Sequence, residues 1–246
     1  MPTLYHGEPS AETLKLTICL REKGLDFAAH FVDEASLARW SDTHRKLAPQ
    51  GQLPVLIDGD LAMTEAAFAL QYLAEAYSPR LAPTAPADWY NTQAWIATLD
   101  MALGPAVNLL GWMKLTSRET RDDYRRRLAA VPGRQAPAGW AAVWADAEAN
   151  EDQLANARER IGQAVGRIER RLAEADWLAG TDYSIADIAA FGHCHSLPRL
   201  LPAIVNTDAT PRTLDWISRI AARPAVVAAM ALRRAPGSAD CYSPPR

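Results

Sequence analysis

The stretch that most constrains the fold runs from Gln50 to Glu65. Val55 to Ile57 are apolar and mainly β-branched, which suits a buried strand. Asp58-Gly59 signals a tight turn, because glycine tolerates the positive φ that a hairpin requires. A second short strand is expected at 61–63. The pattern therefore predicts a strand, a turn, a strand and then the start of a helix.

Pro54 is the unusual residue of this stretch. Proline lacks an amide N–H, and the bond before proline is the one that adopts the cis form. A cis Leu53–Pro54 bond would turn the Leu53 backbone outward and leave its N–H and C=O free for the peptide group of a ligand. Thr64 is expected to cap the following helix, which places Glu65 in the first turn, where the helix dipole favours an anion.

Composition limits the partners and the compartment. The net charge of −3 gives no signal for binding polyanions, so no nucleic-acid partner is expected. The chain shows no basic-then-apolar start and no unbroken apolar run of about 18 residues, so no membrane segment is expected. Cys19, Cys194 and Cys241 form an odd, widely spaced set, which argues against a disulfide framework and against a metal site. These features together predict a cytoplasmic protein.

The elements expected along the chain divide it into two parts. Residues 1–77 contain strands at 3–6, 27–32, 55–57 and 61–63, helices at 10–23 and 65–76, and a polar segment at 33–47. Gly24 is a natural stop after the first of these helices. The order β-α-β-α-β-β-α is that of a thioredoxin-like unit. Residues 78–87 form a linker with three prolines, which cannot continue a helix.

Residues 88–236 are expected to form helices without strands, and residues 237–246 a loose tail. The expected helices cover 88–115, 118–130, 153–175, 209–222 and 224–233, with a loop at 131–139. Ser184 and Asp187 precede an apolar run and resemble a capping box.

The Gln50–Glu65 stretch resembles the glutathione transferase family, whose motif reads Gly-Gln-Leu-Pro-x-Leu, then acidic-Gly, then Thr-Glu in this chain. The resemblance implies an α/β thioredoxin-like N-terminal domain followed by an all-α domain, with glutathione as cosubstrate. It also implies a dimer, of two like chains or of this chain with a related transferase.

Within that family the chain looks most like the bacterial β-etherases. The matching pieces are Glu22 to Phe27, Phe31-Val32-Asp33, Gly111-Trp112 and Tyr183 to Ile188, together with the long excursion between Trp112 and Arg158. This resemblance implies an aromatic aryl-ether substrate, namely an α-keto β-aryl ether derived from lignin.

The resemblance assigns the glutathione contacts by position. Leu53, followed by Pro54, would pair its backbone with the cysteinyl part, and Glu65 would receive the γ-glutamyl ammonium. Gln52 and Trp40 would lie near the glycyl end, although relatives often carry a basic residue in place of Trp40. Relatives also carry Ser or Thr in place of Ala66, and the hydroxyl of that residue helps to bind the γ-glutamyl carboxylate. The absence of this hydrogen bond should cost roughly 1.5–3 kcal/mol of affinity for glutathione.

The chemistry requires a thiolate near neutral pH. Free thiols have a pKa near 8.5, and a hydroxyl donor at a helix N-terminus lowers it, because both the donor and the helix dipole favour the anion. Ser10 opens the first helix and is the first candidate for the activating hydroxyl, and Thr13 is the second. The alternative interpretation of Ser10 is a plain N-cap, and both roles are compatible.

The site for the apolar substrate is expected between the domains, along the helix that starts near residue 88. Its candidate wall residues are Met101, Asn108, Leu109, Trp112 and Met113, and ordinary helical core is the alternative for each. His193 and His195 flank Cys194 and point two ways on a helix, so they form a poor metal pair.

Two further functions stay open at this point. The chain could be a catalytically weak or inactive subunit that stabilises an active relative in a heterodimer. The missing hydroxyl at Ala66 would be consistent with such a loss of catalysis. It could also be a general transferase that acts on another electrophile, because such sites are built from ordinary apolar side chains.

Overall fold

The computed structural model describes residues 1–7, 10–34, 36–115, 117–131 and 149–232. The expected tail at 237–246, and all of the expected loop at 131–139 except its first residue, lie outside these ranges.

The N-terminal part is built on a four-stranded sheet. Its strands are β1 (Thr3–His6), β2 (Ala28–Phe31), β3 (Val55–Asp58) and β4 (Leu61–Met63), in the order β2-β1-β3-β4. β1 and β2 are parallel, whereas β3 pairs antiparallel with both β1 and β4. In the β3–β4 hairpin Asp58 pairs with Leu61 and Gly59 has a φ of 59°, which confirms the predicted turn. Ala29 lies on the edge strand β2 and is exposed.

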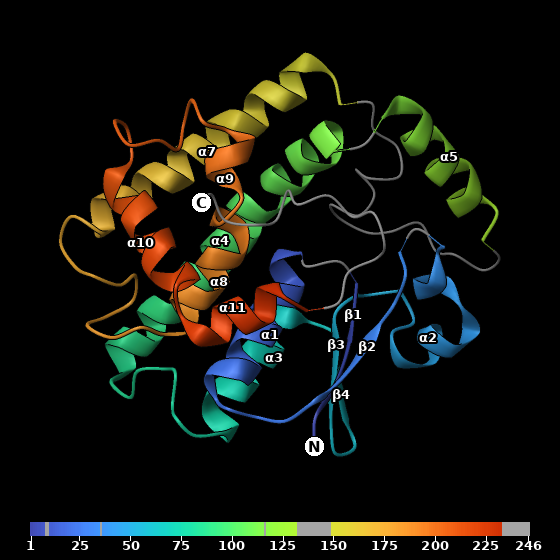
Figure 1. Cartoon of the computed structure of the whole chain (residues 1–246), viewed down its shortest axis with the longest axis horizontal. Helices are drawn as coiled ribbons and strands as arrows, with labels where there is room; N and C mark the ends of the chain where they lie inside the picture. Colours follow the sequence, from blue (N-terminus) through green and yellow to red (C-terminus); the bar gives the residue numbers. More distant parts are fainter. Residues whose placement is uncertain (8–9, 35, 116, 132–148, 233–246) are drawn as a thin grey trace.

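Helices cover both faces of this sheet. They are α1 (Ala11–Glu22), the 3₁₀ turn η1 (Ala38–Trp40), α2 (Asp42–Leu47) and α3 (Ala66–Ala76). α1 and α3 lie on one side of the sheet and α2 lies on the other (Figure 1). Gly24, with a φ of 62°, follows the C-cap of α1 as predicted. This arrangement confirms the thioredoxin-like unit.

The second part is helical throughout its described residues. Its helices are α4 (Pro86–Leu115), α5 (Arg118–Ala129), α7 (Glu151–Arg171), α8 (Ile185–Cys194), α9 (Leu197–Leu200), α10 (Pro211–Ala221) and α11 (Pro224–Met230). α4 begins inside the expected linker, because a proline suits the first turn of a helix, where its missing N–H would have no helical partner. α7 begins at Glu151, earlier than expected, because Asn150 and Gln153 form a capping box.

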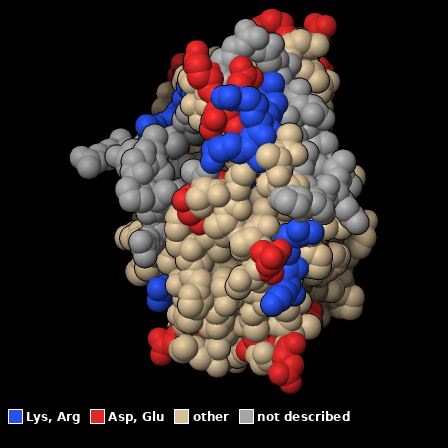
Figure 2. Space-filling view, turned by 90° about the vertical axis from the view of Figure 1, so that its right-hand side faces the viewer, with Lys and Arg blue, Asp and Glu red and all other residues tan. Residues whose placement is uncertain are grey.

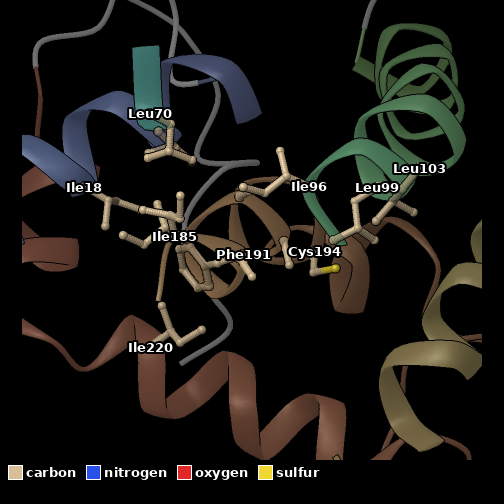
Figure 3. Packing of buried hydrophobic residues seen from close by; sticks show 14 of the residues in the cluster. Ile18, Leu70, Ile96, Leu99, Leu103, Ile185, Phe191, Cys194 and Ile220 are labelled. Atoms are coloured by element: carbon tan, nitrogen blue, oxygen red, sulfur yellow. The ribbon is translucent and has the colours of Figure 1, made fainter. Parts of the chain in front are cut away.

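One apolar core joins the two parts. Figure 3 shows Ile18 and Leu70 from the N-terminal part close to residues of the helical part, such as Ile96 and Phe191. These side chains are at most 1% exposed. α1 is therefore held by residues from both parts of the chain.

No membrane segment was expected from the sequence, but α4 has the length and composition of one. Residues Pro86–Lys114 are long and apolar enough to cross a membrane by length and composition. α4 is also the helix on which α7 and α8 pack, and part of its apolar surface is buried inside the protein. The core helix of a globular domain passes the same test, so this feature is weak support for a membrane span.

α5 carries a run of three arginines, Arg125 to Arg127, of which the last two are exposed. Arg125 pairs with Asp122 at 3.1 Å, while Asp123 pairs with Arg126 at 3.3 Å and with Arg127 at 2.8 Å. Figure 2 views the molecule from the right-hand side of Figure 1, and it shows basic and acidic side chains mixed in the upper part, where α5 lies. The arginines of this run are locally compensated, so they do not form a uniform positive surface.

Candidate functional site

The backbone edge at Leu53 has the predicted form. The Leu53–Pro54 peptide bond is cis, and pairing with β1 begins at Val55. Within the described part of the chain, neither the N–H nor the C=O of Leu53 makes a hydrogen bond. Both groups therefore remain available to the peptide of a bound ligand.

Two side chains that were not predicted from the sequence hold the backbone that leads into this edge. The Nε2–H of His44, on α2, donates to the Gln52 carbonyl over 2.8 Å. Arg39, in η1, donates from Nε to the Gly51 carbonyl over 2.7 Å and from Nη1 to Glu34 over 2.7 Å. No local motif reveals the contacts with Gly51 and Gln52, because they join the polar segment at 33–47 to a later loop through folding.

Glu65 lies next to this edge at the start of α3. It is the N-cap itself, without a side-chain capping bond, so the expectation that Thr64 caps the helix is wrong. The chain reaches helical geometry only at Ala66, one residue later than a Thr64 cap would require. The Glu65 carboxylate is exposed and makes no hydrogen bond or ion pair with another described residue. It is therefore free to receive an ammonium group.

Ala66 is the first residue of α3 and is 7% exposed. We expect Ala66→Ser to lower the Kd for glutathione about tenfold, because a hydroxyl there restores a hydrogen bond to the γ-glutamyl carboxylate. Isothermal calorimetry measures this change. Ala67→Ser is the matched control on the same turn, and an equal gain from both variants would contradict the assignment.

Trp40 and Gln52 lie beside the same edge. The Trp40 ring packs on Gly51, where an added Cβ would come within 3.2 Å of it, and Gly51 has a φ of 67°. The Trp40 Nε1–H is buried and donates no hydrogen bond to the described residues. The side-chain oxygen of Gln52 accepts a hydrogen bond from the Gln50 amide over 3.1 Å. The structure thus brings both residues to the loop that leads into Leu53, and their contact with the glycyl end stays a prediction.

The two candidate hydroxyls meet at the N-terminus of α1. Ser10 is the N-cap, and its Oγ accepts a hydrogen bond from the Thr13 amide over 3.3 Å. The same hydroxyl donates to Thr13 Oγ1 over 3.4 Å, a long hydrogen bond. Ser10 is half-buried and Thr13 is buried. Capping uses a lone pair of Ser10 Oγ, so a bound thiolate need only replace Thr13 Oγ1 as the acceptor of the Ser10 proton.

Behind this turn a buried lysine meets two partly exposed carboxylates and a buried histidine. Lys15 donates to Glu12 Oε1 over 2.8 Å and also to Asp100 Oδ1, which pairs with His193 Nε2 over 2.9 Å. Burial alone would raise the pKa of Asp100, but the hydrogen bond from His193 and the charge of Lys15 hold that pKa below its usual value. The ligand-type atoms of Glu12, Asp100 and His193 lie within 4.8 Å of one another. The cation that these carboxylates bind is the Lys15 ammonium.

The candidate substrate residues are only partly brought together. Asn108, Trp112 and Met113 lie half-buried in the last third of α4, where the Trp112 ring meets Tyr124 of α5 at a centroid distance of 5.6 Å. Met101 lies two turns earlier and is 74% exposed. Tyr124 is an aromatic neighbour that helical periodicity alone did not identify.

His193 and His195 take different partners, as their spacing predicts. His193 faces Asp100, whereas His195 Nδ1 lies 3.0 Å from the Gly192 carbonyl and 3.2 Å from the Phe191 carbonyl.

The fold and this edge define the class of protein. Residues 2–75 match the N-terminal domain of glutathione S-transferases, and residues 134–224 match the C-terminal domain. The chain belongs to the glutathione S-transferase family, and glutathione is the cosubstrate that this family uses.

Two relatives and one crystal structure resemble this chain over most of its length. The chain is 29% identical over 238 residues to Protein LigF of Sphingobium sp. strain NBRC 103272 / SYK-6, covering 91% of this chain and 90% of that protein. It is 28% identical over 236 residues to glutathione S-transferase PARB of Nicotiana tabacum, covering 92% and 96%. The crystal structure of beta-etherase LigF from Sphingobium sp. strain SYK-6 superposes with a TM-score of 0.79 at 28% identity, covering 93% of this chain and 98% of the other.

Proposed function

We propose that this glutathione transferase is a β-etherase that acts on aryl ethers derived from lignin. The bound glutathione thiolate attacks the carbon that bears the aryloxide. A C–S bond forms as the C–O bond breaks, and the phenolate leaves with the bonding electron pair. An α-keto group makes this carbon more electrophilic, so the reaction does not require an acid group from the protein.

The similarity to LigF, which extends over both domains, carries this proposal. The arrangement of the site supports it, because a free peptide edge at Leu53 and two hydroxyls at the start of α1 suit a bound thiolate. In this mechanism the protein chiefly positions the thiolate and lowers the pKa of the thiol.

The decisive assay combines this chain alone with glutathione and an α-keto β-aryl ether that carries a fluorogenic phenol. We expect glutathione-dependent phenol release and an equal amount of the glutathione thioether, measured by chromatography. The same assay without glutathione is the control. Thioether formation with an aryl halide but not with the ether would favour a general transferase instead.

The alanine at position 66 favours a second candidate, a partner subunit with weak or no catalysis. Calorimetric titration with glutathione separates the two functions, because a partner subunit of this kind would give no binding heat. A dimer, of like or unlike chains, stays a prediction, and light scattering of the purified chain tests whether it forms a dimer with itself. A cytoplasmic location also stays a prediction.

A further inference from the structure

Lys15 is a fully buried ammonium one turn into α1. Its side chain is 0% exposed, and it lies 2.8 Å from Glu12 Oε1 while also donating to Asp100 Oδ1 of α4. A buried charge is costly unless it is paired and hydrogen-bonded, and here two carboxylates supply the pairing. Burial lowers the pKa of Lys15, but the two carboxylates more than offset this effect, so the ammonium stays charged.

His193 of α8 completes the cluster without adding charge. Its Nε2–H donates to Asp100 Oδ1 over 2.9 Å, while its buried Nδ1 has no hydrogen-bond partner among the described residues. A proton on Nδ1 would be a buried donor without an acceptor, so the neutral Nε2–H tautomer fits the site. The ring is also seated against α4, since a Cβ at Gly104 would lie 3.1 Å from His193 Cε1. The cluster thus holds one positive and two negative charges.

The cluster lies directly beside the two candidate hydroxyls. Glu12 stands between Ser10 and Thr13 in the first turn of α1, and its carboxylate is 29% exposed. A carboxylate there opposes the formation of a second anion on the same turn. The other charged contacts of α1 are at its far end, where Glu22 pairs with Arg223 of α11 and Lys23 binds backbone carbonyls that follow α3.

We propose that Lys15 tunes the ionisation of bound glutathione by cancelling the charge of Glu12 beside the activating hydroxyl. Asp100 and His193 hold the ammonium in place from the helical domain. Lys15 touches neither the described Leu53 edge nor Ser10, so it acts through the electrostatic potential at the start of α1. This inference rests on glutathione binding at the N-terminus of α1 and does not depend on which electrophile reacts.

The test is a pH titration of the thiolate absorbance of bound glutathione. Because two unit charges interact through an effective dielectric constant of about 20 or more, each charge change should shift the thiol pKa by roughly 0.5–1 unit. Lys15→Met should raise this pKa and Glu12→Gln should lower it. The double variant restores the net charge of the cluster and should return the pKa to near the wild-type value.

Glu22→Gln is the matched control, because it breaks an ion pair between α1 and the helical domain at the other end of the helix. It should leave the thiol pKa unchanged. A merely structural role for Lys15 would move the pKa in the same direction in both single variants, or in neither, and either result overturns the proposal. If Lys15→Met does not fold, Glu12→Gln decides alone, since a raised or unchanged pKa contradicts the proposal. Inactivity toward aryl ethers would contradict the β-etherase function and leave this titration intact, whereas an absence of glutathione binding by the wild type overturns both.

Discussion

Replacement of Ser10 by alanine is expected to lower kcat/KM for glutathione-dependent turnover by well over tenfold. The hydroxyl at the α1 N-cap is the donor that we assign to the thiolate, and a hydrogen bond to a charged group contributes about 1.5–3 kcal/mol. The loss should appear in kcat and in a raised thiol pKa, with little change in the Kd for glutathione. Thr13→Ala should have a smaller effect, since Thr13 is more deeply buried.

The double role of Ser10 calls for a control that separates capping from catalysis. Ser117 caps α5 with the same geometry, accepting from the Thr120 amide over 3.2 Å. Ser117→Ala should therefore cost about 1 kcal/mol of stability, like Ser10→Ala, but leave kcat unchanged. Ser10→Asp should restore the cap without restoring the donor, because an ionised carboxylate only accepts hydrogen bonds. Full activity in Ser10→Asp would contradict the assignment.

Replacement of Asp187 by alanine should lower the free energy of unfolding by about 3–5 kcal/mol. Asp187 is fully buried at N3 of α8, where the capping box with Ser184 confirms the prediction from sequence. Its carboxylate accepts from the Leu178 amide over 3.1 Å, from the Ser184 amide over 3.1 Å and from Trp216 Nε1 over 3.0 Å. Alanine would leave all three donors buried without an acceptor.

Urea denaturation measures this loss, and Asp215→Ala is the control. Asp215 is the neighbour of Trp216 but pairs at the surface with Arg219, so its replacement should cost less than 1 kcal/mol. A loss below 1 kcal/mol for Asp187→Ala as well would show that the buried network contributes little.

The effect of Asp187→Ala should also depend on pH. Burial raises the pKa of Asp187 to about 6, although its hydrogen bonds, led by that from Trp216, oppose the shift. A carboxyl group whose pKa is raised on folding stabilises the protein fully below the unfolded pKa of about 4, and this contribution is lost as the pH rises through the folded value. The destabilisation by alanine should therefore be larger at pH 4 than at pH 7, by up to about 3 kcal/mol. Equal losses at both pH values would contradict the raised pKa.

Features encoded over short spans were predicted from the sequence. The hairpin after β3, the stop at Gly24, the capping box at Ser184 and the helical positions of Ser10 and Thr13 depend on turn and cap chemistry within a few residues. The cis bond at Pro54 belongs to this group. The cap of α3 was misplaced, from Glu65 to Thr64, since both neighbours carry side chains that suit a helix start. The starts of α4 and α7 were placed two residues too late.

The sequence alone thus determined the family, the order of the elements and the backbone edge at Leu53, because each is written in contiguous residues. Tertiary structure alone decided what surrounds that edge. The hydrogen bond of His44 to the Gln52 carbonyl, and the meeting of Lys15 with Asp100 and His193, join residues from separate elements. A lysine in a helix of a globular protein is ordinarily expected at the surface. Only the packing of α8 on α1 and the contact with Asp100 of α4 show that this one is buried, and the carboxylates of Glu12 and Asp100 explain how it remains charged.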